Sequence, residues 1–314
     1  MLKILYASDL HGSDIIFKKL VNAATIHKVN VIIVGGDITG KGIVPIVREK
    51  NTYISSIYGT RYVASSQDEL KELVKRISNL GFYPYIFEKG EEVKLNDQEY
   101  FNQLFTKLSR ERLLSWINYA EEKMKDSNVE FFMMPGNDDP YEIDTVFDNS
   151  ELIINHANKI VDLRNARYEL IGNDNSNITP WNCPRDVPEE ELKKKLETLL
   201  SSVKDLSRTI LNTHCPPYGT SLDLAPKLDK DLKPRISGGG LAMDHVGSTS
   251  VREVIEKYQP LIGLHGHIHE SRGIEKIGKT ILMNAGSAYN EGVLLAALII
   301  LDENKVRNHI FLKG

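Results

Sequence analysis

Short apolar runs that each end in a polar side chain are the feature that most constrains this sequence. Residues 31–37 read Val-Ile-Ile-Val-Gly-Gly-Asp, so a run suited to a strand buried on both faces stops at two glycines and a carboxylate. The same pattern of an apolar run followed by Asp, Asn or His recurs at residues 3–11, 129–139, 209–214 and 260–269. Open α/β sheets hold ligands at the carboxyl edge of their strands, so we expect these side chains to gather at one edge.

The spacing of apolar residues predicts a βαβ opening followed by a long interruption. Residues 14–27 have a helical apolar pattern that begins at Asp14, and a right-handed crossover should lead into the strand at 31–37. The alternation then stops, and residues 41–125 hold many of the 13 tyrosines and 9 phenylalanines. Within them we predict a hairpin over 43–58, a helix over 66–80 capped by Ser66, a strand over 83–87 and a helical stretch over 97–124 broken near Ser109.

We interpret residues 41–125 as an insertion between two site-bearing strands. Residues 1–314 then form a single domain whose core comprises residues 1–40 and 126–314. The insertion could be a cap over the site or could merely cover one side of the core. A cap predicts that its deletion leaves a folded core, whereas a packing role predicts insoluble protein.

Composition places the chain among ordinary globular proteins and excludes some partners. It is 41% hydrophobic and 26% charged, and its net charge of -4 shows no basic excess, so nucleic acid is not indicated beyond a small nucleotide substrate. No apolar run reaches the ~18–20 residues of a membrane span. The two cysteines, Cys183 and Cys215, fit a reducing cytosol, so we expect a cytoplasmic protein. The sequence does not indicate an oligomeric state.

Two pairs of polar residues are spaced two apart at predicted strand ends. Asp9 and His11 form the first pair, and His267 and His269 form the second. On a strand, residues two apart point to the same face, so each pair could bind one ion. His265 precedes the second pair and could either support the ligands or pack inward.

Two further candidates follow other strands. Residues 136–139 read Gly-Asn-Asp-Asp, which is either a simple turn or a turn that presents Asn137 as a neutral oxygen ligand. His214 ends an apolar run and could equally be a buried core histidine. The adjacent Cys215 is a less favoured ligand, because the two prolines that follow fix the loop around His214 instead.

Taken together, these strand ends supply more ligands than one ion needs. The candidate metal ligands are Asp9, His11, Asp37, Asn137, His214, His267 and His269. Seven ligands exceed the four of a tetrahedral zinc site and suit two ions roughly 3.5–4 Å apart. Asp37 is the expected bridge, because it ends the central strand. Mixed His, Asp and Asn ligation accepts Mn, Fe, Co, Ni or Zn, of which we expect manganese or iron.

The ordered motifs Asp-x-His, Gly-Asp, Gly-Asn-x-Asp, a separate His and Gly-His-x-His resemble those of the calcineurin-like metallophosphoesterase family. The resemblance covers residues 1–40 and 126–290. It implies an α/β fold, a four-layer α/β/β/α sandwich of two mixed sheets, here with an inserted cap segment. It also implies one metal ion on Asp9, His11, Asp37 and His269, and the other on Asp37, Asn137, His214 and His267.

One position departs from the family pattern. Much of the family has a histidine after the asparagine, where it acts as a general acid or steadies the phosphoryl group. This chain has Asp138 there, so the identity of the acid is open. We expect Asn137, Asp138 and His214 to be the catalytic residues. Asn137 and Asp138, with His245 and His265 as substitute donors, are the expected substrate contacts.

The resemblance implies a metal-dependent phosphoric ester hydrolase in which a hydroxide that bridges the two metals attacks phosphorus in line. A negative Asp138 would repel the extra charge of a phosphate monoester and would not supply a proton near neutral pH. We therefore predict a phosphodiesterase. The alternatives are a phosphomonoesterase, a nuclease, or a catalytically silent scaffold on the same fold.

Overall fold

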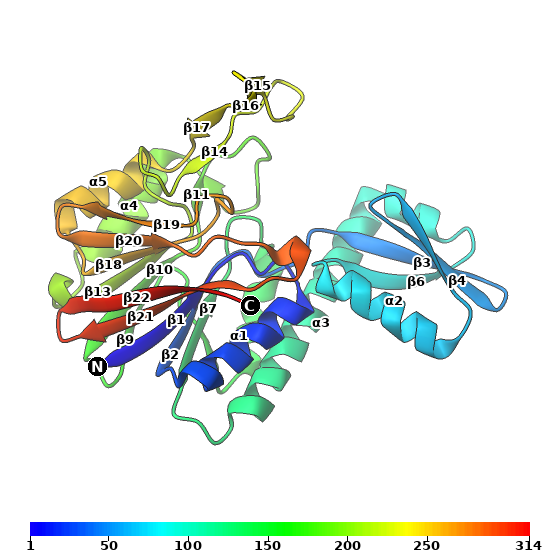
Figure 1. Ribbon diagram of the computed structural model, residues 1–314, viewed down its shortest axis with the longest axis horizontal. Helices are drawn as coiled ribbons and strands as arrows, with labels where there is room; N and C mark the ends of the chain where they lie inside the picture. Colours follow the sequence, from blue (N-terminus) through cyan, green and yellow to red (C-terminus); the bar gives the residue numbers. More distant parts are fainter.

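The computed structural model describes all residues, 1–314, and contains two six-stranded sheets (Figure 1). The first sheet has the order β22-β21-β1-β2-β7-β8. Its strands are β1 (Leu2–Ala7), β2 (Val31–Gly35), β7 (Glu130–Met134), β8 (Ile153–Asn155), β21 (Leu295–Asp302) and β22 (Lys305–Lys313). The four strands from β1 to β8 run parallel, and β21 and β22 add an antiparallel edge.

The second sheet has a similar plan, with the order β19-β20-β18-β13-β10-β9. Its strands are β9 (Ile160–Leu163), β10 (Tyr168–Asn173), β13 (Thr209–Thr213), β18 (Ile262–His265), β19 (Gly273–Ile277) and β20 (Thr280–Asn284). The four central strands are parallel, while β9 and β19 pair antiparallel at the two edges. Both sheets are therefore mixed, as predicted.

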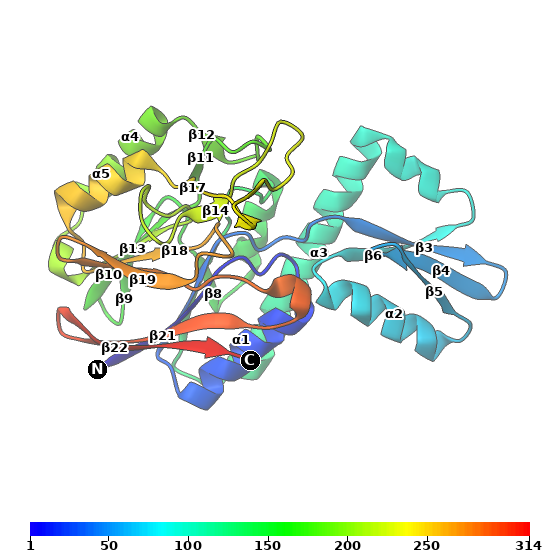
Figure 2. The ribbon, with the colours of Figure 1, turned by 45° about the horizontal axis from the view of Figure 1, so that its top comes forward.

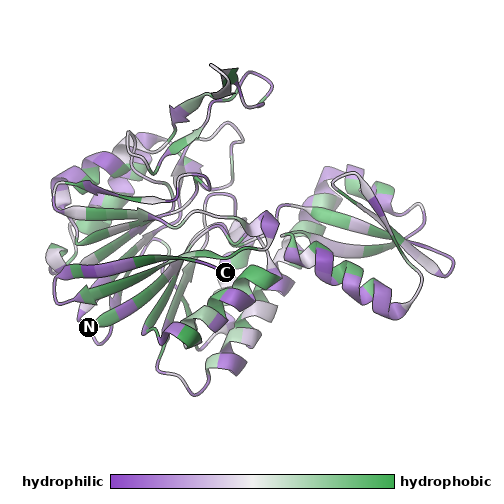
Figure 3. Ribbon diagram, viewed as in Figure 1, coloured by the Kyte–Doolittle hydropathy of each residue, from purple (hydrophilic) through white to green (hydrophobic).

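Helices cover the outer face of each sheet, which confirms the four-layer α/β/β/α sandwich (Figure 2). The covering helices are α1 (Asp14–His27) and α3 (Gln98–Met124) on the first sheet, and α4 (Glu189–Leu200) and α5 (Thr249–Tyr258) on the second. Strand alternation explains how one strand serves two layers. In β1, Leu5 and Ala7 pack under the helices, whereas Ile4 and Tyr6 pack between the sheets. Figure 3 shows this pattern as apolar strands covered by helices with one polar side.

Residues 41–125 begin with a small sheet that lies beside the sandwich (Figure 1). Its order is β5-β4-β3-β6, and α2 (Gln67–Asn79) packs on it. The strands are β3 (Ile43–Glu49), β4 (Thr52–Ile57), β5 (Thr60–Ala64) and β6 (Tyr83–Glu88). The predicted cap of α2 is confirmed, since Ser66 Oγ accepts a hydrogen bond from Glu69 N. Strand β5 was not predicted, because only two residues separate it from β4 and the sequence does not mark where one strand ends and the next begins.

Helix α3 is continuous, so the break predicted near Ser109 is wrong. Ser109 Oγ donates to the carbonyl of Phe105 one turn earlier, at 2.8 Å, and this bond is compatible with the helix. The second half of α3 packs against α1. Trp116 stacks on Phe17 with ring centroids 4.5 Å apart. One helix therefore starts in the insertion and ends in the hydrophobic core of the sandwich.

Short elements complete the chain. They are β11 (Ser176–Asn177), β12 (Asp186–Val187), β14 (Leu224–Pro226), β15 (Ile236–Ser237), β16 (Gly240–Leu241) and β17 (Met243–His245), with the 3-10 turns η1 (Glu92–Asn96), η2 (Tyr141–Asn149), η3 (Leu206–Arg208) and η4 (Tyr289–Glu291). The β14–β17 hairpin and the smaller β15–β16 hairpin project from one end of the second sheet (Figure 1). No helix combines the length and apolar character needed to cross a membrane.

Candidate metal centre

Several predicted ligands lie in loops just beyond the strands and have left-handed backbone. The φ angles are 57° at Asp9, 42° at His11, 50° at Asp37 and 66° at His267. The prediction that strand alternation brings Asp9 and His11 together is therefore wrong, because β1 ends before them. The turning backbone brings the pair to one side instead. Non-glycine residues rarely adopt this conformation, and such strain is concentrated at functional sites.

The first cluster joins Asp9 and His11, after β1, to His269, after β18. Their ligand atoms all lie within 4.8 Å of one another. Asp9 Oδ1 is 3.4 Å from His269 Nε2, and the Nε2 atoms of His11 and His269 are 3.0 Å apart. The backbone N–H of His267 donates to both oxygens of Asp9, which fixes the carboxylate in place.

The second cluster joins Asp37, after β2, to His214, after β13, and His267, again within 4.8 Å. His214 Nδ1 donates to the carbonyl of Gly35 at 2.9 Å, so Nε2 is the ring nitrogen that could bind a metal ion once its proton is displaced. That Nε2 is buried without a hydrogen-bond partner and lies 3.3 Å from Asp37 Oδ1. The ring is thus held in the orientation that a metal ligand requires.

Asn137 is oriented in a similar way. Its Nδ2 donates to Asp186 Oδ1 at 2.8 Å, while its own Oδ1 is buried and has no partner. A buried acceptor without a donor costs free energy unless something positive faces it. Asp186 was not recognised from the sequence, because no local pattern relates it to a residue about 50 positions earlier.

Asp37 lies between the two clusters. Its Oδ1 faces His214 at 3.3 Å, and its Oδ2 faces His11 at 3.7 Å. The two oxygens of one carboxylate therefore point to members of different clusters. This is the arrangement expected of a carboxylate that bridges two ions.

Three glycines allow this close packing. A Cβ atom at Gly36 would lie 2.3 Å from His214 Nδ1, and one at Gly136 would lie 2.3 Å from Asp37 Oδ1. A Cβ at Gly266 would lie 2.5 Å from Asp9 Oδ2. Each of these glycines belongs to one of the sequence motifs, so its small size serves the approach of the ligands.

The electrostatics of the centre favour positive charge. Burial disfavours ionisation of Asp37, but the adjacent His214 holds the pKa of that carboxyl well below its usual range. Conversely, burial alone would lower the pKa of His214, yet the Asp37 carboxylate raises it to about 10. Asp9 remains ionised for the same reason, with its pKa lowered by His269 despite burial. The buried unpartnered acceptors and the ionised carboxylates fit divalent cations.

Lys41 also reaches this centre, although its sequence context did not reveal it. Its Nζ donates to Asp138 Oδ2 at 2.5 Å. Asp138 in turn forms a third cluster with His11 and Asp37, so the ion pair lies beside the Asp37 carboxylate. Burial opposes the charge on Lys41, but Asp37 and Asp138 raise its pKa above the usual value.

The other two predicted contacts, His265 and His245, belong to none of the ligand clusters. His265 is fully buried in β18 with its Nδ1 2.9 Å from Thr213 Oγ1, so the structure does not bring it to the site surface. His245 is on β17, where its Nδ1 lies 2.7 Å from Asp223 Oδ1. Tyr289, by contrast, was not anticipated, and its ring centroid lies 4.6 Å from that of His11.

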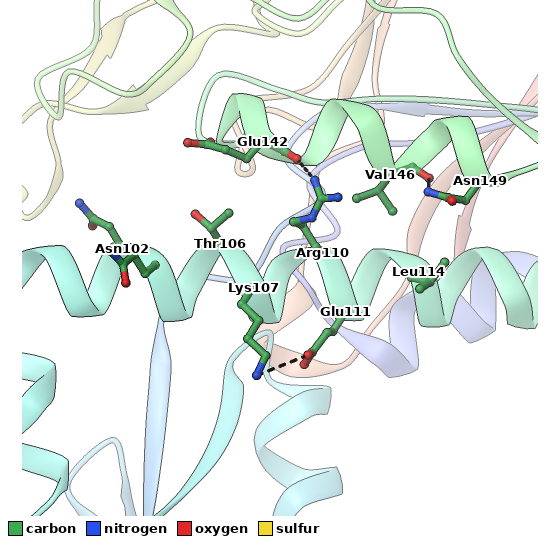
Figure 4. Close-up of a pocket in the computed structure, with 10 residues that line it drawn as sticks. Asn102, Thr106, Lys107, Arg110, Glu111, Leu114, Glu142, Val146 and Asn149 are labelled. Carbon is green, nitrogen blue, oxygen red and sulfur yellow. Dashed lines mark hydrogen bonds and ion pairs between the residues drawn. The ribbon is translucent and has the colours of Figure 1, made fainter.

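An open groove of about 660 Å³ lies between α3 and η2. It is lined by ten residues, only two of them hydrophobic. Arg110 crosses it to donate to the carbonyl of Glu142 (Figure 4). Its guanidinium also donates to Thr145 Oγ1. None of the predicted ligands lines the groove, so it is separate from the candidate metal centre.

Comparison with known proteins agrees with this geometry. Residues 2–271 match the family described as calcineurin-like phosphoesterase, and the chain belongs to that family. The uncharacterized protein MJ1162 of Methanocaldococcus jannaschii is 38% identical over 158 residues, which cover 50% of this chain and 63% of that protein. The alignment thus spans less than two thirds of that relative.

One solved structure shares the fold at low sequence identity. One crystal structure superposes with a TM-score of 0.55 at 17% identity, covering 99% of this chain and 98% of the other. A structure described as a novel archaeal phosphodiesterase matches with a TM-score of 0.40 at 12% identity, covering 99% of this chain and 100% of the other. The chain thus combines membership of the calcineurin-like phosphoesterase family with two adjoining groups of residues that could each hold a metal ion.

Proposed function

We propose that this protein is a dinuclear metal-dependent phosphodiesterase. The single observation that carries the proposal is the position of Asp37, whose two oxygens face His214 in one cluster and His11 in the other. A protein that used this fold only as a scaffold, without catalysis, would have no need of two adjoining clusters of buried residues suited to binding cations. The proposed ligands are Asp9, His11, Asp37 and His269 for one ion, and Asp37, Asn137, His214 and His267 for the other.

Two divalent ions held there would supply Lewis-acid polarisation of the phosphoryl group and would lower the pKa of water. The residues of the chain provide the surroundings for that chemistry. His214 and Asn137 keep fixed orientations through Gly35 and Asp186, so their ligand atoms need little reorganisation. We favour manganese or iron, and Zn, Ni and Co remain compatible with these ligands.

The preference for diesters rests on Asp138. The sequence predicted that its charge repels monoesters, but the structure pairs it with Lys41, so the pair carries no net charge. What remains is that position 138 has an aspartate where a histidine could have protonated a leaving oxygen near neutral pH. A diester with a good leaving group needs that proton least, which supports a diesterase over a phosphomonoesterase.

Matched aryl monoester and diester substrates test this proposal. The manganese-loaded protein should hydrolyse bis(4-nitrophenyl) phosphate with a higher kcat/KM than 4-nitrophenyl phosphate. Asp138→His should gain on the monoester. A wild type that prefers the monoester would indicate a phosphatase, and turnover that survives complete chelation would contradict the metal-dependent mechanism. Cleavage of single-stranded DNA at a comparable kcat/KM would indicate a nuclease.

We further propose a cytoplasmic location. The support is that Cys183 and Cys215 are both free. Free cysteines are typical of reducing compartments. Fractionation of the native host, with blotting for this chain, would test the location directly.

A further inference from the structure

Lys41 is anchored by the insertion and points at the proposed metal centre. Its backbone N–H donates to the carbonyl of Gly81 at 3.0 Å, and the preceding Gly40 N–H donates to Tyr83 Oη at 2.7 Å. Two contacts thus tie the start of the insertion to Gly81 and to the first residue of β6. The backbone beneath the lysine is fixed at this point, so its side chain has a defined origin.

The ammonium group has unused hydrogen-bonding capacity. It carries three N–H donors, and one of them is used by Asp138. The side chain retains 32% of its exposure, so solvent reaches the group. Because an Asp138 oxygen lies within 4.8 Å of ligand atoms of His11 and Asp37, the ammonium stands next to the centre that would hold a phosphate ester.

A purely structural ion pair is a poor explanation of this arrangement. Pairs this exposed contribute little stability, typically ~0–1 kcal/mol. The pair also adds a carboxylate to a region already rich in negative charge, from Asp9 and Asp37. Asp138 holds the Lys41 ammonium beside the centre, and this arrangement is useful if the ammonium binds a negatively charged group of a ligand.

We propose that Lys41 binds substrate by donating a hydrogen bond to a phosphoryl oxygen, with Asp138 as the residue that positions it. The inference rests on the proposed phosphoesterase function and adds a contact from the insertion to it. Lys41 thereby supplies the positive group that a histidine in the place of Asp138 would have offered. The insertion then contributes directly to substrate binding.

Lys41→Met is the test, with Lys41→Arg as the charge-retaining variant and Lys71→Met as the matched control. Lys71 is an exposed lysine on α2 that pairs only with Asp68. Loss of a charge-assisted hydrogen bond should weaken binding of inorganic phosphate to manganese-loaded protein by about 10-fold to 100-fold. We expect a similar loss in kcat/KM for the diester, a smaller loss in Lys41→Arg, and none in Lys71→Met.

An Asp138→Ala background separates substrate binding from simple charge neutralisation. If Lys41 contacts substrate, Lys41→Met still weakens phosphate binding when Asp138 is absent. Equal phosphate binding by Asp138→Ala and the double variant would overturn the inference, as would unchanged binding in Lys41→Met with full metal content. A wild type that binds phosphate but hydrolyses no ester would contradict the proposed function while leaving the phosphate contact intact.

Discussion

The Nε2 atoms of His11 and His269 face each other 3.0 Å apart at the edge where two strands end. Two lone pairs at that distance repel, so the pair needs a proton or another cation between or beside the nitrogens. Asp9 lies 3.4 Å from His269 and adds negative charge to the same point. Either a proton or a metal ion at this point would therefore stabilise the pair.

Metal binding should raise the stability of the folded protein. At manganese concentrations about 100 times the dissociation constant, one site adds ~2.7 kcal/mol to the free energy of unfolding. Asp37→Asn should lose most of the gain, because Asp37 faces both clusters, whereas His269→Ala should lose the part from one ion. Thermal unfolding with and without metal, together with bound-metal content, measures both effects. His309→Ala, outside the clusters, is the control, and equal metal content in Asp37→Asn and His269→Ala would contradict the bridging role.

Asp186 should set metal affinity through Asn137. Removal of its carboxylate in Asp186→Ala frees the Asn137 amide to rotate and should weaken the second ion by about 10-fold to 100-fold. Asp186→Asn keeps an acceptor oxygen for Asn137 Nδ2 but loses the acceptor for Thr179 and Cys183, so it should restore part of the affinity. Titration against a competing chelator measures the affinities, with exposed Asp205→Ala as control. Wild-type affinity for both ions in Asp186→Ala would show that the orientation of Asn137 does not matter.

Local spacing explains which site residues the sequence could predict. Asp9, Asp37 and His214 each directly follow an apolar run, so strand order alone brings them to one edge. Lys41 and Asp186 belong to no such pattern. They reach the site only because the insertion and the loop before α4 fold back on the sandwich, and these contacts depend on tertiary packing. Strand alternation was also the wrong reason for the correct pairing of Asp9 with His11.

The sequence predicts the position of helix α3 but not that its second half packs in the core of the sandwich. The helical stretch predicted over 97–124 matches its bounds, yet the change of packing partners along one continuous helix leaves no mark in the sequence. Trp116 is 2% exposed, stacks on Phe17 and donates to Asp14 Oδ1 at 2.8 Å. Deletion of residues 41–125 would therefore remove part of the sandwich core as well as the small sheet. We expect that deletion to give insoluble protein even if the small sheet acts as a cap.

Trp116→Ala tests the packing of α3 without the deletion. Loss of a buried tryptophan should reduce the free energy of unfolding by ~3–5 kcal/mol. Leu114→Ala, on the same helix but 41% exposed, should lose much less. Urea unfolding of the metal-loaded variants gives both values. A loss below ~1 kcal/mol in Trp116→Ala would show that the second half of α3 is dispensable to the core.

Acid should destabilise the fold through His156, which is fully buried outside the metal ligands. Burial lowers its pKa from 6.5 to about 4, even though a hydrogen bond with Asn212 partly offsets this. Because the pKa is lower in the folded chain, the unfolded chain binds the extra proton between these values. Stability is therefore complete above about pH 6.5 and falls as the pH drops toward 4, by up to ~3 kcal/mol at 1.36 kcal/mol per unit.

His156→Gln removes this titration and should flatten the pH dependence between pH 6.5 and 4. Urea unfolding of wild type and variant, both with chelator so that metal release contributes to neither, gives the two slopes. At pH 8 the wild-type ring is neutral in both the folded and the unfolded chain. The difference in free energy of unfolding between wild type and variant at that pH therefore contains no contribution from titration of His156. That difference should shrink or reverse toward pH 4.5. If it is constant across the range, His156 does not contribute to acid sensitivity.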